Sequence, residues 1–443
     1  MAERRPRVDP ARRAALDVLV AVRSDDAYAN LVLPHVLDKY GLSGRDAGFV
    51  TELASGTLRQ QGTYDAILAA CLDRPLARVQ AKVLDVLRLG AHQVLSMRVP
   101  TFAAIDATVD LAKQSTNASG LVNAVLRKVA ARDLDDWLAT LDIADPLDRA
   151  AVAHSHPRWV VDALREALDG VGAVAELDDL LASDNAAPQV TLVARPGRSE
   201  VNELPGVPTR FSPYGVVLAS GSPAAVEAVR EKRAGVQDEG SQLVALALAD
   251  APLEGRDDLW LDLCAGPGGK AALLDALADV RGASLIANER QVHRAGLVAS
   301  HGVRRVVAGD GGAPPFAAGT FDRILVDAPC SGLGALRRRP EARWRKQPAD
   351  ITALVPLQVR LATSALELVR PGGLVVYATC SPVLAETRDV VTRVLADTGA
   401  DLIPIESAVP DGAGPIPGTL QLWPHRHGTD AMFMALLRRP SRD

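Results

Sequence analysis

The chain has 443 residues, a net charge of −5, and 48% hydrophobic against 23% charged residues. These values are close to the soluble globular average, so they exclude a disordered or fibrous chain. At roughly 150 residues per domain, the length predicts about three domains, or two with elaborations. The four cysteines are too few and too scattered for a disulfide framework or a zinc site. No apolar run reaches the roughly 20 residues of a membrane helix, and no secretory signal stands at the start. We therefore expect a cytoplasmic protein with no membrane partner and no metal.

The first third of the chain is expected to be helical throughout. Apolar residues recur at helical spacing, for example over residues 79–94 and 121–129, and no strand-like alternation interrupts them. Glycine and proline separate the helical stretches. This pattern predicts an all-helical domain over residues 1–137.

Residues 138–235 carry a weaker signal. A helix is expected over 156–168, and short strands are expected over 189–197 and 215–220, between proline-rich loops. This predicts a small α+β connector, to which we assign no chemistry.

After residue 236, short apolar strands alternate with helix-length segments. The expected strands are 259–265, 284–289, 304–310, 322–329 and 372–380, and residues 431–439 could form a further, antiparallel strand at the end of the sheet. This alternation predicts an α/β domain over residues 236–443, with a Rossmann-like, mostly parallel sheet buried on both faces. Ligands of such sheets bind beyond the carboxyl ends of the strands, so each strand end is a candidate site.

A glycine-rich turn, DLCAGPGGK (262–270), follows the first of these strands. It completes neither the phosphate-binding G-x-x-x-x-G-K-[ST] pattern nor the dinucleotide-binding G-x-G-x-x-G pattern. Glu289 ends the second strand, where an acid typically binds ribose hydroxyls, and Asp310 ends the third, where it could meet an adenine amino group. Together they favour S-adenosylmethionine over NAD or ATP. A purely structural turn with solvated carboxylates is the alternative.

Two cysteines follow the fourth and fifth strands, in DAPCSG (327–332) and YATCSP (377–382). A free cysteine is often an inert apolar residue, and we expect this of Cys71 and Cys264. Two thiols at neighbouring strand ends instead suit carbon methylation of a pyrimidine. A thiolate adds to cytosine C6, C5 then attacks a sulfonium methyl group, and an acid near ring N3, here Asp327, stabilises the base. The chemistry alone does not decide which thiol adds.

These motifs resemble, in the same order, those of the Sun (Fmu) family of RNA cytosine-5 methyltransferases, in particular its bacterial members that modify small-subunit ribosomal RNA. The segment GVQDEGSQLVALAL (235–248) is similar to the family's lead-in motif. The helical first third resembles the RNA-binding factor NusB. The resemblance implies a NusB-like domain, the connector and a class I methyltransferase domain that uses S-adenosylmethionine to methylate a cytosine in small-subunit (16S) ribosomal RNA.

The resemblance also implies residue roles. Cys380 would be the nucleophile, and Cys330 would assist release of the methylated base. The implied cofactor contacts are Cys264, Ala265, Gly266, Pro267, Gly268, Gly269, Lys270, Glu289, Asp310 and Asp327. The sequence departs from the family where Thr387, after Glu386, replaces the usual Asn, and where HGTDAMFMALL (427–437) replaces an Asp-Gly-Phe-Phe pattern. Both departures lie outside the expected catalytic set.

A basic segment, LGALRRRPEARWRK (333–346), follows Cys330 and resembles the family's basic segment. A run of cations is often only a solvated face. Next to a catalytic loop, contact with RNA phosphates is favoured, and Trp344 could stack on a base. The candidate RNA contacts are Arg337, Arg338, Arg339, Arg343, Trp344, Arg345 and Lys346.

Other functions remain open at this stage. A catalytically inactive RNA-binding assembly factor would keep the same domains. An S-adenosylmethionine-dependent transferase to another RNA, to protein or to a small molecule would share the cofactor turn, although transfer to protein or to a small molecule would not need both thiols. An oxidoreductase would need the dinucleotide pattern, which is incomplete. No DNA partner is expected, and the oligomeric state is not predicted.

Overall fold

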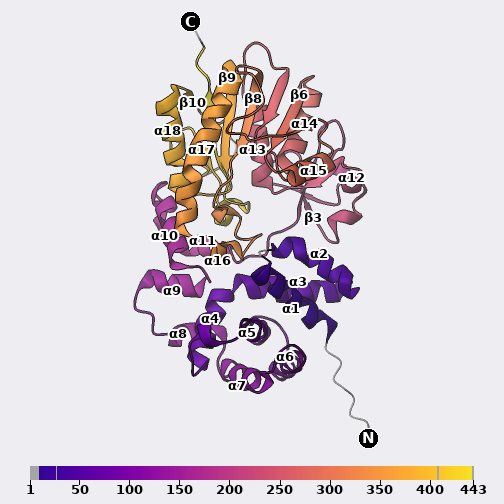
Figure 1. Cartoon of the computed structure of the whole chain (residues 1–443), viewed down its shortest axis with the longest axis vertical. Helices are drawn as coiled ribbons and strands as arrows, with labels where there is room; N and C mark the ends of the chain where they lie inside the picture. Colours follow the sequence, from indigo (N-terminus) through magenta and orange to yellow (C-terminus); the bar gives the residue numbers. More distant parts are fainter. Residues whose placement is uncertain (1–8, 26, 407–408, 442–443) are drawn as a thin grey trace. The chain divides into compact units, whose positions relative to one another are not determined.

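The computed structural model describes residues 9–25, 27–406 and 409–441, and the chain forms two compact units (Figure 1). The first, the helical unit, contains the chain up to Asp162 together with Asp184–Ala186 and Leu336–Arg345. The second, the catalytic unit, contains Ala163–Ser183, Ala187–Ala335 and the chain from Lys346 onward. This partition cuts through the expected connector, so the boundaries at 137 and 235 remain a prediction.

The helical unit confirms the expectation of a helical first third. Asp9 caps the first helix by accepting a hydrogen bond from the Ala11 N–H, and Gly41 ends the second with φ +62°, a conformation that glycine adopts without strain. The apolar stripes of the helices meet in one core, to which Leu16, Ile67 and Leu87 contribute. The helices are α1 (Pro10–Ser24), α2 (Ala29–Tyr40), α3 (Gly44–Arg59), α4 (Gln61–Cys71), α5 (Ala81–Leu95), α6 (Thr101–Ser115), α7 (Ser119–Val129), α8 (Leu134–Thr140), α9 (Pro146–Ala153) and the short α16 (Ala342–Arg345).

The larger sheet of the catalytic unit has the strand order β10-β12-β9-β8-β5-β6-β7. Its strands are β5 (Leu259–Asp262), β6 (Ser284–Glu289), β7 (Val306–Ala308), β8 (Phe321–Asp327), β9 (Val369–Thr379), β10 (Asp401–Ile403), β11 (Leu420–Gln421) and β12 (Phe433–Arg438). β5 to β9 pair in parallel, whereas β12 runs antiparallel to β9, as expected. β12 does not end the sheet, however, because β10 pairs with its other edge.

Helices cover both faces of this sheet (Figure 1). Alternate residues of β8 point to opposite faces: Leu325 packs into the core under α13 and α14, while Ile324 and Val326 pack under α17 and α18. This burial on both faces explains why the strands are continuously apolar. The helices of this unit are α11 (Leu177–Ser183), α12 (Glu227–Arg230), α13 (Glu239–Ala249), α14 (Gly269–Val280), α15 (Val292–Ser300), α17 (Pro348–Leu368), α18 (Arg388–Thr398) and α19 (Pro424–His427), and α10 (Arg158–Asp169) spans the boundary between the units.

Within the described part of the chain, only α17 is long and apolar enough to meet the criteria for a membrane span. Its residues Leu361, Ala365 and Leu368 are buried in the core beneath the sheet. A buried core helix meets the same criteria, so this is weak support for a span.

A second, four-stranded antiparallel sheet precedes the large one, in the order β2-β3-β1-β4. Its strands are β1 (Thr191–Ala194), β2 (Gly206–Pro208), β3 (Gly215–Leu218) and β4 (Ala234–Val236). The expected strands at 189–197 and 215–220 correspond to β1 and β3. β2 and β4 have three residues each, too few to show an alternating pattern.

Candidate active site

The glycine-rich turn joins β5 to α14, and two of its glycines are sterically required. Gly268 has φ +124°, which side chains rarely tolerate. A Cβ on Gly266 would lie 2.1 Å from Oε2 of Glu289. That close approach allows the Gly266 N–H to donate a hydrogen bond of 3.0 Å to the same oxygen. The turn therefore has the bare, closely approachable backbone that a nucleoside cofactor needs.

The two expected nucleoside acids sit at the ends of β6 and just after β7. Glu289 is 5% exposed, and its other oxygen accepts the Gln291 N–H at 2.9 Å. A carboxylate oxygen has two acceptor positions, so both oxygens retain capacity for ribose hydroxyls. Asp310 is exposed and accepts the Gly312 N–H at 2.9 Å. Both residues fit a nucleoside, and their contacts with one remain a prediction.

An ammonium–carboxylate pair lies at the same strand ends. Nζ of Lys270 donates to Oδ2 of Asp327 at 2.8 Å, and the two side chains are 13% and 26% exposed. Burial alone would lower the pKa of Lys270, but the charge and hydrogen bond of Asp327 outweigh it and raise that pKa. The pair therefore offers a fixed positive charge and a partly accessible acid in one place.

Asp262, at the end of β5, is a site residue that the sequence reasoning missed. Its side chain is fully buried, and its Oδ1 accepts the Cys264 N–H at 3.3 Å. Burial, reinforced by the charge of Asp327, raises the pKa of Asp262 to about 8. The signal was present, because Asp262 is the first residue of the turn motif and ends a strand that points to the site.

The structure brings the two expected thiols into contact. Cys330 and Cys380 follow the adjacent parallel strands β8 and β9, and their sulfur atoms are 3.4 Å apart. The pKa of Cys330 is raised well above its usual value by its hydrogen bond with Cys380 and by burial. The charge of Cys380 is one of the interactions that raise the pKa of Lys270, so this ammonium lies close to the second thiol. The pair thus combines one thiol held in its neutral form with one that has a nearby cation.

The other two cysteines are placed as expected of structural residues. Cys71 is buried in the core of the helical unit, and burial raises its pKa. Cys264 packs against the core under the large sheet, and burial raises its pKa well above the usual value. Among the described residues, no group of three or more His, Cys, Asp or Glu side chains could hold a metal ion.

The basic segment requires a correction. Arg343 is fully buried in the helical unit, where its guanidinium donates to the Ser155 carbonyl at 3.0 Å and to Oδ1 of Asn185 at 2.9 Å. Arg337 is also buried, with 7% exposure. A buried guanidinium is not available to an RNA phosphate, so the expectation is wrong for these two arginines.

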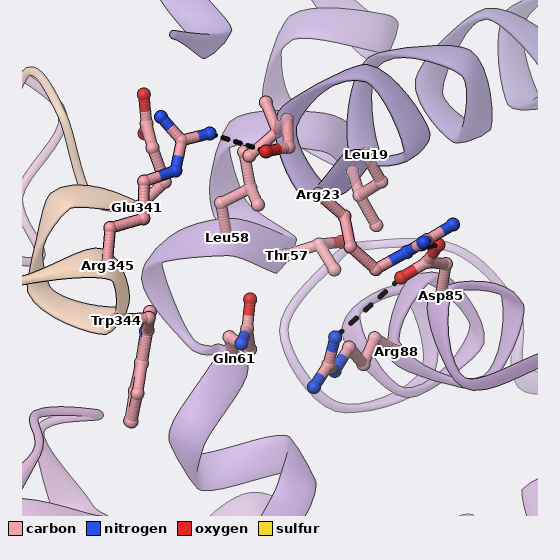
Figure 2. Close-up of a pocket in the computed structure, with 11 residues that line it drawn as sticks. Leu19, Arg23, Thr57, Leu58, Gln61, Asp85, Arg88, Glu341, Trp344 and Arg345 are labelled. Carbon is pink, nitrogen blue, oxygen red and sulfur yellow. Dashed lines mark hydrogen bonds and ion pairs between the residues drawn. The ribbon is translucent and has the colours of Figure 1, made fainter. Parts of the chain in front are cut away.

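Trp344 and Arg345 belong to the wall of a cavity within the helical unit. Both line a cavity of about 190 Å³, together with residues of α1, α3, α4 and α5 (Figure 2). Nη2 of Arg345 donates to the carbonyl oxygen of Ala27 at 2.6 Å. Arg338, Arg339 and Lys346 remain candidate RNA contacts, of which Arg339 is exposed, and the stacking of Trp344 on a base stays a prediction.

The chain is similar to known proteins over nearly its whole length. The profile of the 16S rRNA methyltransferase RsmB/F family matches residues 248–438, and that of the NusB family matches residues 9–131. A Mycobacterium tuberculosis protein, Rv1407, whose name gives methyltransferase without a substrate, is 50% identical over 451 residues and covers 98% of each chain. Ribosomal RNA small subunit methyltransferase B of Pseudomonas syringae pv. tomato is 34% identical over 454 residues, which is 96% of each chain.

Solved structures support the fold. The crystal structure of PH0851 matches with a TM-score of 0.80 and 21% identity, over 98% of this chain and 100% of that one. NSun6 from Pyrococcus horikoshii, solved with the S-adenosylmethionine analogue SFG, matches with a TM-score of 0.54 and 17% identity, over 63% of this chain and 98% of that one. The sequence matches confirm the resemblance to the Sun family. The chain belongs to the RsmB/F family of 16S rRNA methyltransferases and is an S-adenosylmethionine-dependent methyltransferase with a NusB-like helical region.

Proposed function

We propose that this enzyme methylates C5 of a cytosine in small-subunit ribosomal RNA, in the cytoplasm. The observation that carries the proposal is the 3.4 Å contact between the sulfur atoms of Cys330 and Cys380, at the strand ends that also hold Lys270 and Asp327. A methyltransferase that acts on a nucleophilic nitrogen or oxygen needs no thiol. Cytosine C5 is a poor nucleophile and becomes reactive only after a thiolate has added to C6.

Cys380 is the thiol that we assign to addition. Its sulfur forms a bond with C6, and the electron pair of the C5–C6 double bond moves toward C5 and the ring. Asp327, held in place by Lys270, is the residue that we assign to ring N3: with a proton on its carboxyl group it would donate to N3 and so stabilise the electron density gained there. S-adenosylmethionine supplies the methyl group that C5 takes up. The target base must leave its stack to reach these groups.

Cys330 is the group that we assign to release. In the enzyme without RNA, its hydrogen bond with Cys380 is the main reason for its raised pKa. Once Cys380 is bonded to C6, that interaction ends and Cys330 can lose its proton more readily. It can then take the proton from C5, so that the electron pair of the C5–H bond restores the double bond and expels the Cys380 thiolate.

The assignment of the RNA rests on similarity and on charge. Relatives named for small-subunit ribosomal RNA match nearly the whole chain, and the NusB profile matches its helical part. The exposed guanidinium of Arg339, which lies 4.9 Å from the centre of the Tyr28 ring, could bind a phosphate or stack on a base. We propose Arg338, Arg339 and Lys346 as the RNA-contact part of the basic segment.

Bisulfite sequencing of ribosomal RNA tests this function. A strain that lacks the gene should lose cytosine-5 methylation at one or more positions of the small-subunit RNA, and a plasmid copy should restore it. A plasmid copy with Cys380→Ala should not restore it. An unchanged methylation pattern in the deletion strain would remove the assignment. Restoration by the Cys380→Ala copy would remove the role of that thiol.

A further inference from the structure

A buried carboxylate lies between the two thiol loops. Glu386 belongs to the short turn Leu384–Glu386 that follows β9, and it has no exposed surface. One carboxylate oxygen accepts the Ser331 N–H at 2.7 Å and Nε2 of Gln358 at 3.0 Å. The other accepts the hydroxyl groups of Ser331 and Ser381, the latter at 2.6 Å. Four donors thus converge on one side chain.

Two of the four donors belong to the residues that directly follow the two thiols. Ser331 directly follows Cys330, and Ser381 directly follows Cys380. The two hydroxyl oxygens are 3.1 Å apart and share the same carboxylate oxygen. The two loops are separated by 50 positions in the sequence. The pairing of β8 with β9 and a 2.9 Å hydrogen bond from the Gly334 N–H to the Cys380 carbonyl oxygen hold the loop backbones together, and Glu386 is the side chain that binds the residue after each thiol.

In all four contacts the Glu386 side chain is the acceptor. A carboxylate only accepts hydrogen bonds, and four donors from neutral groups satisfy it inside the protein. Glutamine at this position would present an N–H₂ group toward one pair of these donors. The turn that carries Glu386 is also held in place, because the Tyr377 hydroxyl donates to the Glu386 carbonyl oxygen at 2.7 Å.

We propose that Glu386 is a positioning residue that sets the distance between the Cys330 and Cys380 sulfur atoms. Its effect on methyl transfer rests on the proposed function, whereas its effect on the thiol distance does not. Addition and release use different thiols on the same base, so an error in their separation slows turnover without changing cofactor affinity. A misplacement of about 1 Å can cost on the order of 100-fold in rate.

The direct test uses phenylarsine oxide, whose trivalent arsenic bonds two neighbouring thiols with release of water. The wild-type enzyme should bind it through Cys330 and Cys380, and Cys330→Ser should abolish that binding. In Glu386→Gln the affinity should fall at least about 10-fold, and the kcat should fall about 10- to 100-fold while the KM for S-adenosylmethionine changes less than about twofold. Ser381→Ala, which removes one donor only, should show a smaller loss of both.

Glu239→Gln is the matched control. Glu239 is also a buried carboxylate of the catalytic unit, and it accepts the backbone N–H groups of Phe211 and Ser212 at 2.5 and 2.8 Å. The Glu239→Gln substitution should leave the affinity for phenylarsine oxide unchanged. A folded Glu386→Gln enzyme that binds phenylarsine oxide as tightly as the wild type would overturn the proposal. If Glu386→Gln does not fold, an unchanged affinity of Ser381→Ala for phenylarsine oxide would overturn it instead. Weaker arsenical binding in an enzyme that never methylates cytosine would overturn the proposed function and leave the positioning role standing.

Discussion

Arg343 of the helical unit and Lys270 of the catalytic unit are both cations shielded from solvent, but they have different kinds of partner. In the helical unit, the Arg343 guanidinium donates to the Ser155 carbonyl and the Asn185 side chain, so its hydrogen-bond partners are neutral and fixed by the fold. In the catalytic unit, Lys270 pairs with Asp327, and the charge of Asp327 helps to raise the pKa of the nearby Asp262. Arg343, with fixed neutral partners, therefore stabilises the helical unit, whereas Lys270, Asp327 and Asp262 are titratable groups at the strand ends where we propose the reaction.

The largest expected effect is on the catalytic side. Replacing Cys380 with alanine removes the thiol that adds to C6, so methyl transfer to RNA should fall by on the order of 10³-fold or more. The measurement is transfer of labelled methyl groups from S-adenosylmethionine. Cys71→Ala is the control, because that thiol lies in the helical core and should not affect the rate per folded enzyme. Equal loss in both variants would contradict the assignment.

The next largest expected effect is on the stability of the helical unit, through the buried guanidinium of Arg343. Arg343→Met should destabilise the helical unit by about 3 kcal/mol, since it leaves buried acceptors without a donor. Arg339→Met, four positions earlier and exposed, should change stability by less than about 0.5 kcal/mol. The free energies of unfolding of the two variants can be compared by denaturant titration. Similar stability in the two would show that the buried hydrogen bonds of Arg343 contribute little.

A pH dependence of stability should mark the catalytic unit. Because the pKa of Asp262 is raised to about 8, the folded state holds a proton that the unfolded state has lost above about pH 4. Stability therefore falls as the pH rises toward 8 and levels off above it, with a loss on the order of 2 kcal/mol between pH 6.5 and 8. Asp262→Asn should remove this slope in thermal unfolding. An identical slope in the variant would refute the shift.

The helical unit should show the opposite sign. Burial, with the charge of Arg343, lowers the pKa of His156 well below its usual value. The unfolded state therefore binds a proton that the folded state does not, and stability falls as the pH drops below about 6.5, by about 1 kcal/mol near pH 5.5. Hydrogen exchange of α9 at pH 7 and 5.5 measures this. His156→Gln should show no such difference between the two conditions once intrinsic exchange rates are corrected.

The smallest effect concerns RNA affinity. Arg339→Ala should weaken RNA binding a few-fold and reduce the salt dependence of binding by about one counterion. Arg13→Ala is the control, because Arg13 is a half-buried arginine of the helical unit for which no RNA contact is proposed. Unchanged affinity and salt slope in Arg339→Ala would remove this residue from the RNA surface.

The sequence predicted those features that depend on local pattern. The strands that end at Asp262, Glu289, Asp327 and Thr379 are apolar runs followed by polar turns, so their place and the meeting of the two thiols could be foreseen. The strands β2, β4 and β10 were not predicted. Each has three residues, too few for a periodic signal, whereas the equally short β7 was expected from its place between two helix-length segments.

The burial of the basic segment could not be foreseen. Six cations in ten residues are typical of a solvent-exposed segment. Arg343 is buried, with hydrogen bonds to partners that are distant in the sequence, such as Ser155 and Asn185. The same holds for Glu386. Its hydrogen bonds reach Ser331 and Gln358, 55 and 28 positions away, and no local motif shows them.

The most direct test of the central claim is to trap the intermediate. If Cys330 is needed to release the methylated base, a Cys330→Ala enzyme incubated with S-adenosylmethionine and small-subunit RNA should accumulate a covalent protein–RNA complex. Mass spectrometry should then locate the link at Cys380 and find a methyl group on the attached cytosine. A Cys330→Ala enzyme that turns over at the wild-type rate without a covalent complex, or a link at any other residue, would contradict the account.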